Sequence, residues 1–500
     1  MRHNKLLEAL EALQALQKQG IAVIRSNQLS RTYRERLCKQ GFLQKVINGW
    51  YIPSRPDDSP GDTTAWYTSF WQFCQEYLDS QNSTWCLSSE QSIFLHVENW
   101  TVPKQLLIRS PSANNNVTAL MHNTSLLVVR AAMPTPENQQ KIAGLCVYSL
   151  PAALCACSES FFQQYPTEVK AALLMISDAS SLLHVLLKGG HSVVAGRLVG
   201  AFRYIGKEAI ANDILAAMTA ADYRVQSSNP FKEKADILIP NHKDGPHVNR
   251  MRLMWQAMRP VVMTCFPNKP GLPKDREVYL NSIRGLYTSD AYHSLSIEGY
   301  QVTQDLIERV RSGIWDPSKD CEDRNALAAR GYWQAFNHVQ DSIRRILSGD
   351  NPGEVAREDH SSWYRELFTP NVAAGLIEVS HLAGYRNASV FIRQSMHIPP
   401  SCDAARELMS VFFELLAAEA EPAVRAVLGH FMFVYIHPYM DGNGRIGRFL
   451  MNAMFASGGY PWVVVPLERR QAYMQALEQA SVEQDIQPFA ELLATLQSSG

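Results

Sequence analysis

The sequence lacks the patterns that mark secreted, repetitive or membrane-spanning proteins. Its nine cysteines include no C-x-x-C pair, and the two closest, Cys155 and Cys157, are poorly spaced for binding a metal. A disulfide framework is unusual in a chain of 500 residues, so we expect a reducing, cytoplasmic compartment. No run of about 18 apolar residues occurs, so we expect no segment that spans a membrane and no membrane partner. Internal repeats and low-complexity tracts are absent as well.

The sequence also lacks an overall charge. Its 47 Lys and Arg residues nearly balance 48 Asp and Glu residues, and a net charge of −1 favours no class of partner. Residues 1–55 differ, because they hold ten Lys and Arg residues but only three Asp and Glu residues, a local balance of 10 − 3 = +7. With 46% hydrophobic and 19% charged residues, the chain is typical of a globular protein, and its length suits about two to four domains.

Residues 1–57 form the first predicted region. An amphipathic helix from Leu6 is followed by two short helical pieces within 26–41 and by a hairpin centred on the Asn48-Gly49 pair. This order is typical of a winged helix-turn-helix. Such a module binds DNA through a basic helix and wing, although winged helices also serve as protein-docking modules. The candidate DNA contacts are Arg31, Arg34, Arg36 and Lys45.

Two further regions follow a polar break at 54–63. Residues 64–240 mix an aromatic-rich helix at 65–78, strands at 104–110 and 124–131, and several later helices, which predicts an α+β region. Residues 240–250 are a plausible linker. Residues 251–500 are almost purely helical in pattern, so the expected fold class is mainly α, with an all-α C-terminal region preceded by an α+β region.

The stretch IHPYMDGNGRIGR, residues 436–448, concentrates the chemistry of the C-terminal region. Apolar residues at helical spacing fill 423–436, and Pro438 biases His437 away from helical backbone angles. Turn residues follow, and helical spacing then resumes. A tight glycine-containing loop that leads into a helix places unpaired N–H groups at the positive end of the helix dipole. This layout predicts a cradle for phosphate.

The polar side chains of this stretch suit a nucleotide. Asp441 can hold Mg²⁺, which prefers one or two carboxylates together with phosphate oxygens. Arg445 and Arg448 can neutralise phosphates with forked hydrogen bonds. His437 titrates near neutrality and can take a proton from an attacking hydroxyl. The residues together predict nucleophilic attack on a nucleotide phosphate.

The stretch resembles the Fic (filamentation induced by cAMP) motif, H-P-F-x-[DE]-G-N-G-R-x-x-R, with Tyr439 as the only departure. The resemblance implies an all-α core that moves AMP from ATP to a Ser, Thr or Tyr hydroxyl of a protein. It implies His437 as the base, Asp441 as the Mg²⁺ ligand, Arg445 and Arg448 as phosphate ligands, and an anion hole of Gly442, Asn443 and Gly444. Some relatives move UMP, phosphocholine or phosphate, but the complete G-N-G-R-x-x-R favours AMP.

A second stretch, SLSIEGY at 294–300, is similar to the family's inhibitory signature [ST]-x-x-x-E-[GN], with Ser294, Glu298 and Gly299 at its fixed positions. On a helix, Ser294 and Glu298 lie one turn apart on one face. The resemblance implies that Glu298 pairs with Arg448 and so keeps that arginine from the γ-phosphate of ATP. We therefore expect an autoinhibited enzyme.

Weaker resemblances complete the prediction. Residues 384–401 resemble the hairpin flap along which a target segment pairs in the family, although Arg393 replaces a frequent glycine. Residues 469–480 resemble the last core helix, where Tyr473 either touches the nucleotide or only packs. The N-terminal half loosely resembles the AbiEi type of antitoxin. This leaves open an alternative function, a DNA-binding regulator whose Fic module only senses nucleotide. The target, self-modification and a homodimer also stay open.

Overall fold

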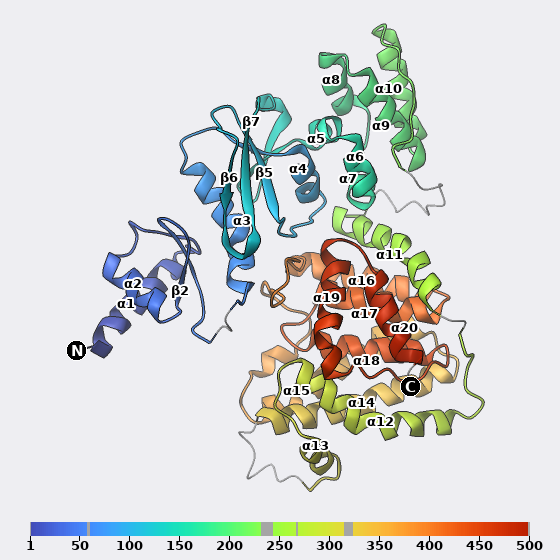
Figure 1. Ribbon diagram of the computed structural model, residues 1–500. Coiled ribbons are helices and arrows are strands. Elements are labelled where there is room, and N and C mark those ends of the chain that lie inside the picture. Colours follow the sequence, from blue (N-terminus) through green and yellow to red (C-terminus); the bar gives the residue numbers. More distant parts are fainter. Residues whose placement is uncertain (1, 58–60, 232–243, 267–268, 315–323, 499–500) are drawn as a thin grey trace. The chain divides into compact units, whose positions relative to one another are not determined.

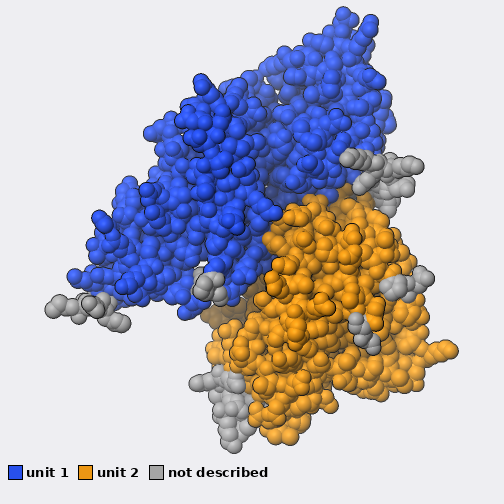
Figure 2. All heavy atoms as spheres, viewed as in Figure 1, with its two compact units in different colours: residues 1–250, 391–398 blue, residues 251–390, 399–500 orange. Residues whose placement is uncertain are grey.

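The computed structural model describes residues 2–57, 61–231, 244–266, 269–314 and 324–498. These residues divide into two compact units, which Figure 2 shows in blue and orange. Unit 1 comprises Met1–Arg250 together with the short segment Phe391–Ile398. Unit 2 comprises Met251–Val390 and Pro399–Gly500.

Unit 1 begins with a small module in which helices pack on a sheet (Figure 1). Its elements are α1 (Arg2–Lys18), β1 (Ile24–Arg25), α2 (Arg31–Lys39), β2 (Leu43–Ile47) and β3 (Trp50–Pro53). The strands pair antiparallel in the order β1-β3-β2. Leu13, Ile24 and Leu37 are buried in a common core, so both helices pack against the sheet. The identification of this module as a winged helix-turn-helix stays a prediction.

One detail of the predicted module is wrong. Of the two helical pieces expected within 26–41, only α2 is a helix, and residues 26–28 form a turn in which the Gln28 N–H donates to the Arg25 carbonyl at 3.0 Å. The Ser30 side chain accepts a hydrogen bond from the Tyr33 N–H at 3.2 Å and so fixes the start of α2. A capped start at Ser30 leaves too few residues before it for a separate helix.

The rest of unit 1 combines a mixed sheet with helices, as the sequence predicts. Its elements are α3 (Thr64–Asp79), β4 (Cys86–Leu87), α4 (Ser89–His96), β5 (Gln105–Ser110), β6 (Asn116–Ala119), β7 (Ser125–Arg130), β8 (Gln139–Ile142), β9 (Leu145–Tyr148), α5 (Leu150–Ala156), α6 (Glu159–Gln164), α7 (Pro166–Leu174), α8 (Ser180–Gly189), α9 (Ser192–Tyr204) and α10 (Glu208–Ala220). The main sheet has the order β4-β5-β7-β6, with β5 and β7 parallel. Trp66 and Phe73 of α3 share a core with Trp50 and Ile52 of β3.

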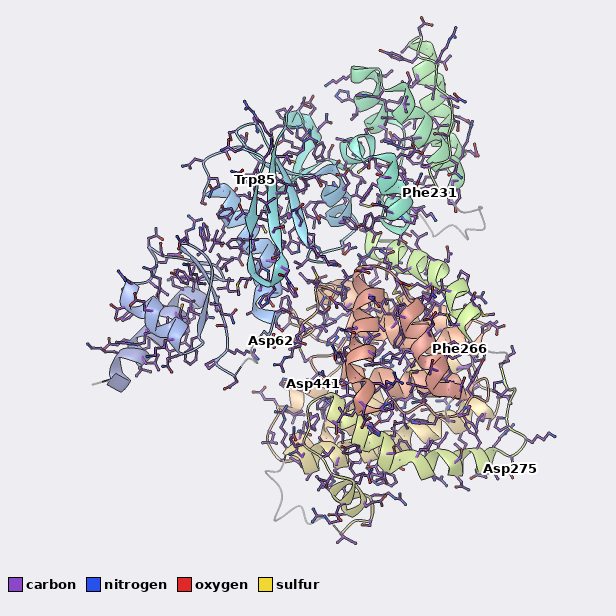
Figure 3. All side chains as sticks on the ribbon, viewed as in Figure 1. Asp62, Trp85, Phe231, Phe266, Asp275 and Asp441 are labelled. Atoms are coloured by element: carbon purple, nitrogen blue, oxygen red, sulfur yellow. The ribbon has the colours of Figure 1, made fainter. Side chains whose placement is uncertain are left out.

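The segment 391–398 belongs to unit 1 although it comes late in the sequence. Met396 packs against the core of α3, and its carbonyl accepts a hydrogen bond from the Val102 N–H at 2.9 Å. Arg393 Nε donates to Oδ2 of the buried Asp62 at 2.5 Å, and Asp62 is labelled in Figure 3. No residue of 384–401 is in a strand, so the predicted hairpin is not formed, and the Met396 carbonyl bonds to Val102, far away in the sequence.

Among its described residues, unit 2 contains helices but no strand. Its elements are α11 (Pro246–Cys265) from Met251 onward, α12 (Arg276–Ile297), α13 (Gln304–Arg311), α14 (Arg324–Leu347), α15 (Pro352–Ala373), α16 (Cys402–Ala418), α17 (Pro422–Ile436), α18 (Asn443–Ala456), α19 (Arg470–Val482) and α20 (Gln487–Ser498). The predicted linker at 240–250 ends where the two units divide, between Arg250 and Met251, but it is already helical from Pro246, where α11 begins. Residues 240–243 of this linker lie outside the described residues. Proline suits the first position of a helix because the N–H it lacks would have no partner there.

Helices α17 and α18 form the centre of unit 2. All residues of α17 except Val434 are buried, which explains its almost continuous apolar sequence. Helix α18 packs along α17 and also against α14 and α15, so both helices are enclosed on several sides. The expected fold class, an all-α C-terminal core after an α+β region, is confirmed. None of the described helices is both long and apolar enough to cross a lipid bilayer.

Candidate functional site

The loop 437–442 joins α17 to α18, and its Asp441 is labelled in Figure 3. Helix α17 ends at His437, whose backbone is left-handed with φ 53° and ψ 59°. Pro438 disfavours the helical region for the residue before it, which explains why the helix stops there. Gly442 caps α18 with φ 81°, and a Cβ at this position would lie 2.8 Å from the Phe368 ring. The loop therefore requires glycine at this position.

Asn443 and Tyr439 fix the shape of the loop. The Asn443 side chain accepts from the Tyr439 N–H and donates to the Tyr439 carbonyl, both at 2.9 Å. The Tyr439 ring is fully buried and stacks on Tyr364, with 3.8 Å between ring centroids and 3° between planes. Tyr439 thus places a buried aromatic ring where the motif has phenylalanine. Its hydroxyl finds no hydrogen-bond partner among the described residues.

The His437 ring is held as a neutral base. Its Nδ1 lies 3.2 Å from the Val434 carbonyl, so Nδ1 carries the hydrogen and Nε2 keeps a free lone pair. Desolvation by the surrounding protein lowers the pKa of His437 to about 4, and the charge of Arg386 acts in the same direction. Glu298 and Asp441 oppose this shift. At neutral pH the ring is therefore uncharged and able to accept a proton.

The first turn of α18 has the features of an anion site. The N–H groups of Asn443, Gly444 and Arg445 belong to the turn in which no carbonyl of the same helix is in reach. Asp441 Oδ1 accepts from the Gly442 N–H at 2.6 Å, while Oδ2 lies 3.4 Å from Arg445 Nη2. The Asp441 side chain is 62% exposed, so its carboxylate remains open to a ligand.

Arg445 and Arg448 are both buried at this helix. The Arg445 guanidinium lies 5.2 Å from the Tyr300 ring centre and 5.1 Å from the Phe368 ring centre. Arg448 donates from Nε to Ser294 Oγ at 2.9 Å and from Nη2 to the Ser294 carbonyl at 3.0 Å. The same Nη2 donates to Glu298 Oε1 at 2.7 Å. The predicted pair of Glu298 and Arg448 is therefore present in the structure.

Glu298 directly follows Ile297, the last residue of α12, and forms the C-cap of that helix. Gly299 follows with φ 90°, and α12 ends in a Schellman motif. In this motif the Gly299 N–H donates to the Ser296 carbonyl and the Tyr300 N–H donates to the Leu295 carbonyl. Glu298 Oε1 also lies directly over Gly444, because a Cβ on that glycine would overlap the carboxylate. The carboxylate therefore occupies the entrance to the first turn of α18.

Tyr473 of α19 lies in the interior of unit 2. It is 2% exposed, and its hydroxyl lies 2.6 Å from Nε2 of the fully buried His430. Arg448 is close enough to act on the pKa of Tyr473, although burial is the larger effect and raises that pKa. Sequence reasoning missed His430, whose only signal was a histidine within an apolar helix.

Sequence reasoning also missed Arg386, which is 2% exposed and donates from Nε to the His437 carbonyl at 2.8 Å. No side-chain pattern signals this contact, because the acceptor is main chain.

The candidate DNA contacts are not alike in exposure. Arg31 and Lys45 are exposed, but each has a neighbour: Arg31 pairs with Glu35 and Lys45 donates to Asn48, both at 2.7 Å. Arg34 and Arg36 are partly buried. Arg34 lies over the Tyr51 ring at 5.5 Å, and Arg36 donates to the Lys5 carbonyl at 2.9 Å. Two of the four therefore stabilise the module itself.

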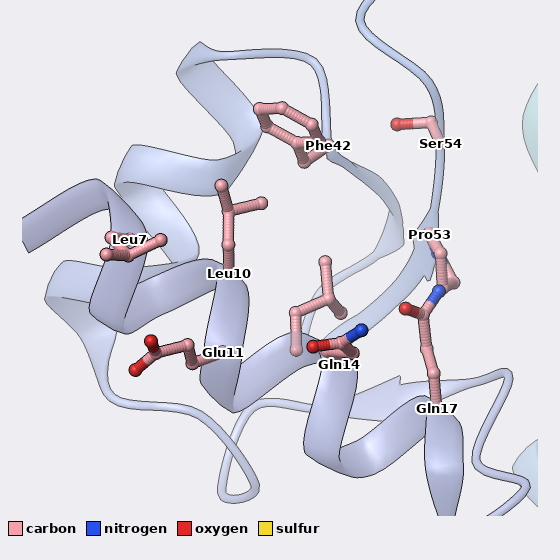
Figure 4. A pocket seen from close by; sticks show the side chains of 9 residues that line it. Leu7, Leu10, Glu11, Gln14, Gln17, Phe42, Pro53 and Ser54 are labelled. Atoms are coloured by element: carbon pink, nitrogen blue, oxygen red, sulfur yellow. The ribbon is translucent and has the colours of Figure 1, made fainter.

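The same module has a shallow hollow of about 360 Å³ beside α1 (Figure 4). The residues that line it are Leu7, Leu10, Glu11, Leu13, Gln14, Gln17, Phe42, Pro53 and Ser54. This lining has no cation for a phosphate, so the hollow does not compete with the loop 437–448 as a nucleotide site. Among the described residues, no group of three or more His, Cys, Asp and Glu side chains is arranged so that it could hold a metal ion.

Comparison with known proteins agrees with the geometry of this loop. Residues 360–455 match the model of the Fic/DOC family. The chain is 30% identical over 218 residues to "Protein adenylyltransferase Fic" of Nematostella vectensis, covering 43% of this chain and 47% of the relative. It is 29% identical over 213 residues to the protein of the same name from Drosophila grimshawi, covering 42% and 41%. The chain thus spans less than half the length of these curated relatives.

Solved structures give a weaker match. A segment of Fic-1 from C. elegans aligns with 18% identity and a TM-score of 0.38, covering 67% of this chain and 85% of that one. From the family match, the chain contains a Fic domain at residues 360–455. The resemblance that the motif suggested is confirmed for this domain, and the resemblance of the N-terminal half to AbiEi-type antitoxins stays a prediction.

Proposed function

We propose that the chain is an autoinhibited protein adenylyltransferase, which moves AMP from ATP to a hydroxyl group of a protein. The observation that carries the proposal is the joint placement of His437, the first turn of α18 and the Glu298–Arg448 ion pair. A neutral base, an anion cradle and a carboxylate that covers the cradle suit an enzyme whose activity is restrained. The names of the curated relatives support the same reaction.

In this reaction His437 is the general base. The target hydroxyl attacks the α-phosphorus of ATP, its proton passes to Nε2 of His437, and the bond to the bridging oxygen breaks so that pyrophosphate leaves. The hydrogen bond from Nδ1 to the Val434 carbonyl holds the ring in the tautomer that this step requires. Because the pKa of His437 is about 4, the ring is ready to accept the proton at neutral pH.

The phosphates bind at the start of α18. The N–H groups of Asn443 and Gly444 form the anion hole, while Gly442 shapes it, and Arg445 neutralises phosphate charge from its buried position. Arg448 binds the terminal phosphate once Glu298 has moved away. Catalysis then comes mainly from positioning and from fixed charges.

The residues at this loop also fit Mg²⁺. Asp441 offers an exposed carboxylate beside the anion cradle, and Mg²⁺ bound with a nucleotide commonly takes one carboxylate, with phosphates and water as its other ligands. The ion, when bound, supplies positive charge that neutralises the phosphates. Asp441 would hold it, and no other protein ligand is required.

Inhibition follows from where Glu298 lies. Its carboxylate takes the Arg448 donor and covers Gly444, so it occupies the place that phosphate charge needs. ATP that enters beside Glu298 meets a like charge and cannot reach Arg448. Removal or movement of Glu298 is therefore the activating step in this proposal.

The test uses the full chain with ATP labelled on its α-phosphate, and intact mass measured after incubation with ATP, CTP, GTP or UTP separately. The Glu298→Gly protein should gain the mass of AMP or transfer it to an added target, with ATP preferred. The added mass identifies the transferred group. Adding His437→Ala to Glu298→Gly should abolish the gain, and unchanged transfer in that double variant would overturn the proposal.

A second candidate function concerns residues 1–57. Their net charge of +7 over residues 1–55, with Arg31 exposed on α2 and Lys45 on β2, favours contact with DNA phosphates. Gel shifts on the DNA upstream of the coding sequence test this. DNA binding without transfer, even by the Glu298→Gly protein, would favour a regulator that senses nucleotide. Transfer that survives deletion of residues 1–60 would favour the enzyme.

A further inference from the structure

Arg386 is a fully buried arginine without a carboxylate partner in the part of unit 2 that the structure describes. It is 2% exposed, and its guanidinium donates to main-chain carbonyls and a thiol. The acceptors are the carbonyls of His437 at 2.8 Å, Ala388 at 3.2 Å and Pro400, and Cys402 Sγ at 3.6 Å. A buried charge satisfied mainly by carbonyls is costly to keep, which indicates that the arrangement serves a purpose beyond packing.

The first contact is with the main chain that carries the base. Arg386 Nε donates to the His437 carbonyl, and the Arg386 N–H donates to the next carbonyl, that of Pro438, at 2.9 Å. These two carbonyls follow the end of α17, where no helix partner remains for them. His437 itself has a left-handed backbone, which a residue other than glycine keeps only when its surroundings hold it. Arg386 holds this backbone through the carbonyls of His437 and Pro438.

The second contact is with both ends of the loop 388–400. The guanidinium binds the carbonyl of Ala388 at the start of this loop and that of Pro400 at its end. Arg406 of α16 donates to the Arg386 carbonyl at 3.2 Å and fixes Arg386 in turn. One side chain therefore joins the two ends of the loop to the backbone of His437.

We propose that Arg386 is a positioning residue for AMP transfer, which holds the His437 main chain and the ends of the loop 388–400 in one fixed arrangement. The inference rests on the proposed function. Because the arrangement fixes the main chain of His437, it sets where the ring of the base lies when the target hydroxyl arrives. Loss of the arrangement should lower the rate of transfer and leave ATP binding largely unchanged.

Arg386 also acts on His437 by charge. The charged groups that face the His437 ring are Arg386, Glu298 and Asp441, and of these only Arg386 is positive. Its charge adds to burial in lowering the pKa of His437, while the two carboxylates act to raise it. Without this positive charge the ring holds its proton to higher pH, and the acid limb of the rate profile moves upward.

The test compares Arg386→Lys and Arg386→Gln, each made in the Glu298→Gly protein so that transfer is measurable. Both should lower kcat by about 10- to 100-fold, the effect expected of a small misplacement of the base, with little change in KM for ATP. Only Arg386→Gln removes the charge, so only it should move the acid limb upward. Arg386→Lys keeps the charge and most of the volume, and it supplies the test if Arg386→Gln does not fold.

Arg425 supplies a matched control. It is also a buried arginine, lies on α17, and donates to the Glu419 carbonyl and to Ser457 Oγ away from the loop. Arg425→Lys should lower the melting temperature but keep the kcat and the pH profile of the Glu298→Gly parent. The inference would be overturned, while the proposed function stands, if the Arg386 variants kept a kcat within about twofold of the parent. An equal fall in kcat for Arg425→Lys would overturn it in the same way. An inactive parent would overturn both.

Discussion

Replacing Glu298 with glycine should release the enzyme. The ion pair that this change removes is short, with 2.7 Å between Arg448 Nη2 and Glu298 Oε1, and it is shielded from water, since the two side chains are 5% and 29% exposed. A hydrogen bond between charged groups in such surroundings contributes about 1.5–3 kcal/mol. If this contact must break before the terminal phosphate reaches Arg448, its loss should raise transfer by about 10- to 150-fold.

The assay is the initial rate of label transfer from ATP, measured at saturating ATP for the wild type and for two variants. The variants are Glu298→Gly and Glu298→Gln. Glu298→Gln keeps the shape of the side chain and an acceptor for Arg448 but loses the charge, so its transfer rate should lie between those of the wild type and Glu298→Gly. Glu483 provides the control, because it is also a glutamate at a helix C-cap in unit 2. Glu483→Gly should transfer at the wild-type rate.

Two outcomes would refute this reasoning. If the wild type binds ATP and transfers as fast as Glu298→Gly, the ion pair does not restrain the reaction. If Glu483→Gly is activated equally, a general loosening of helix ends explains the gain. A gain confined to Glu298→Gly, with Glu298→Gln intermediate, supports inhibition by charge and position together.

Three further predictions follow from the site. The rate of transfer by the Glu298→Gly protein should be constant from about pH 8 to about pH 5 and should fall below about pH 5, because the pKa of His437 is lowered to about 4 and the base is lost only when it is protonated. A midpoint near pH 6.5 in the pH–rate profile would contradict this prediction. Tyr439→Phe should raise the free energy of unfolding by about 1 kcal/mol in urea titrations, because the buried hydroxyl has no partner among the described residues. The rate of transfer should not change, and a lower free energy of unfolding would refute the prediction. Asn443→Ala should lower the free energy of unfolding by about 2 kcal/mol and slow transfer, because the variant loses both hydrogen bonds to the Tyr439 main chain. Stability and a transfer rate equal to those of the wild type would show that these bonds do not hold the loop.

The loop between α17 and α18 was predictable because its side chains act locally. Pro438 stops one helix, Gly442 permits the turn, and Asn443 bonds to a residue four positions earlier. The pair of Glu298 and Arg448 lies 150 residues apart in sequence, and only the resemblance to the Fic family joined them. Side-chain patterns thus located the chemistry, and the resemblance supplied the long-range partner.

The contacts of Arg386, which sequence reasoning missed, use mainly main-chain acceptors. Arg386 binds the carbonyls of His437 and Pro400, and any residue type offers the same carbonyl. The segment 391–398 fails as a hairpin for a similar reason, since Val102 of unit 1 donates its N–H to the Met396 carbonyl. Competition between a local hairpin and a distant partner is decided by tertiary contacts, which strand propensity does not contain.

The position of Glu298 at the end of α12 determines what its release requires. Ser294 lies one turn earlier, within the helix, and binds Arg448 through both its hydroxyl and its carbonyl. Glu298 is the C-cap of α12 and is followed by Gly299, whose backbone is left-handed, and not by a further helical turn. Only this capping residue must therefore move to free Arg448 Nη2 from the Glu298 carboxylate. Helix ends open at low cost compared with helix interiors. In the proposed mechanism, Arg448 therefore stays held by Ser294 when Glu298 leaves, and this arginine is already in place for the phosphate.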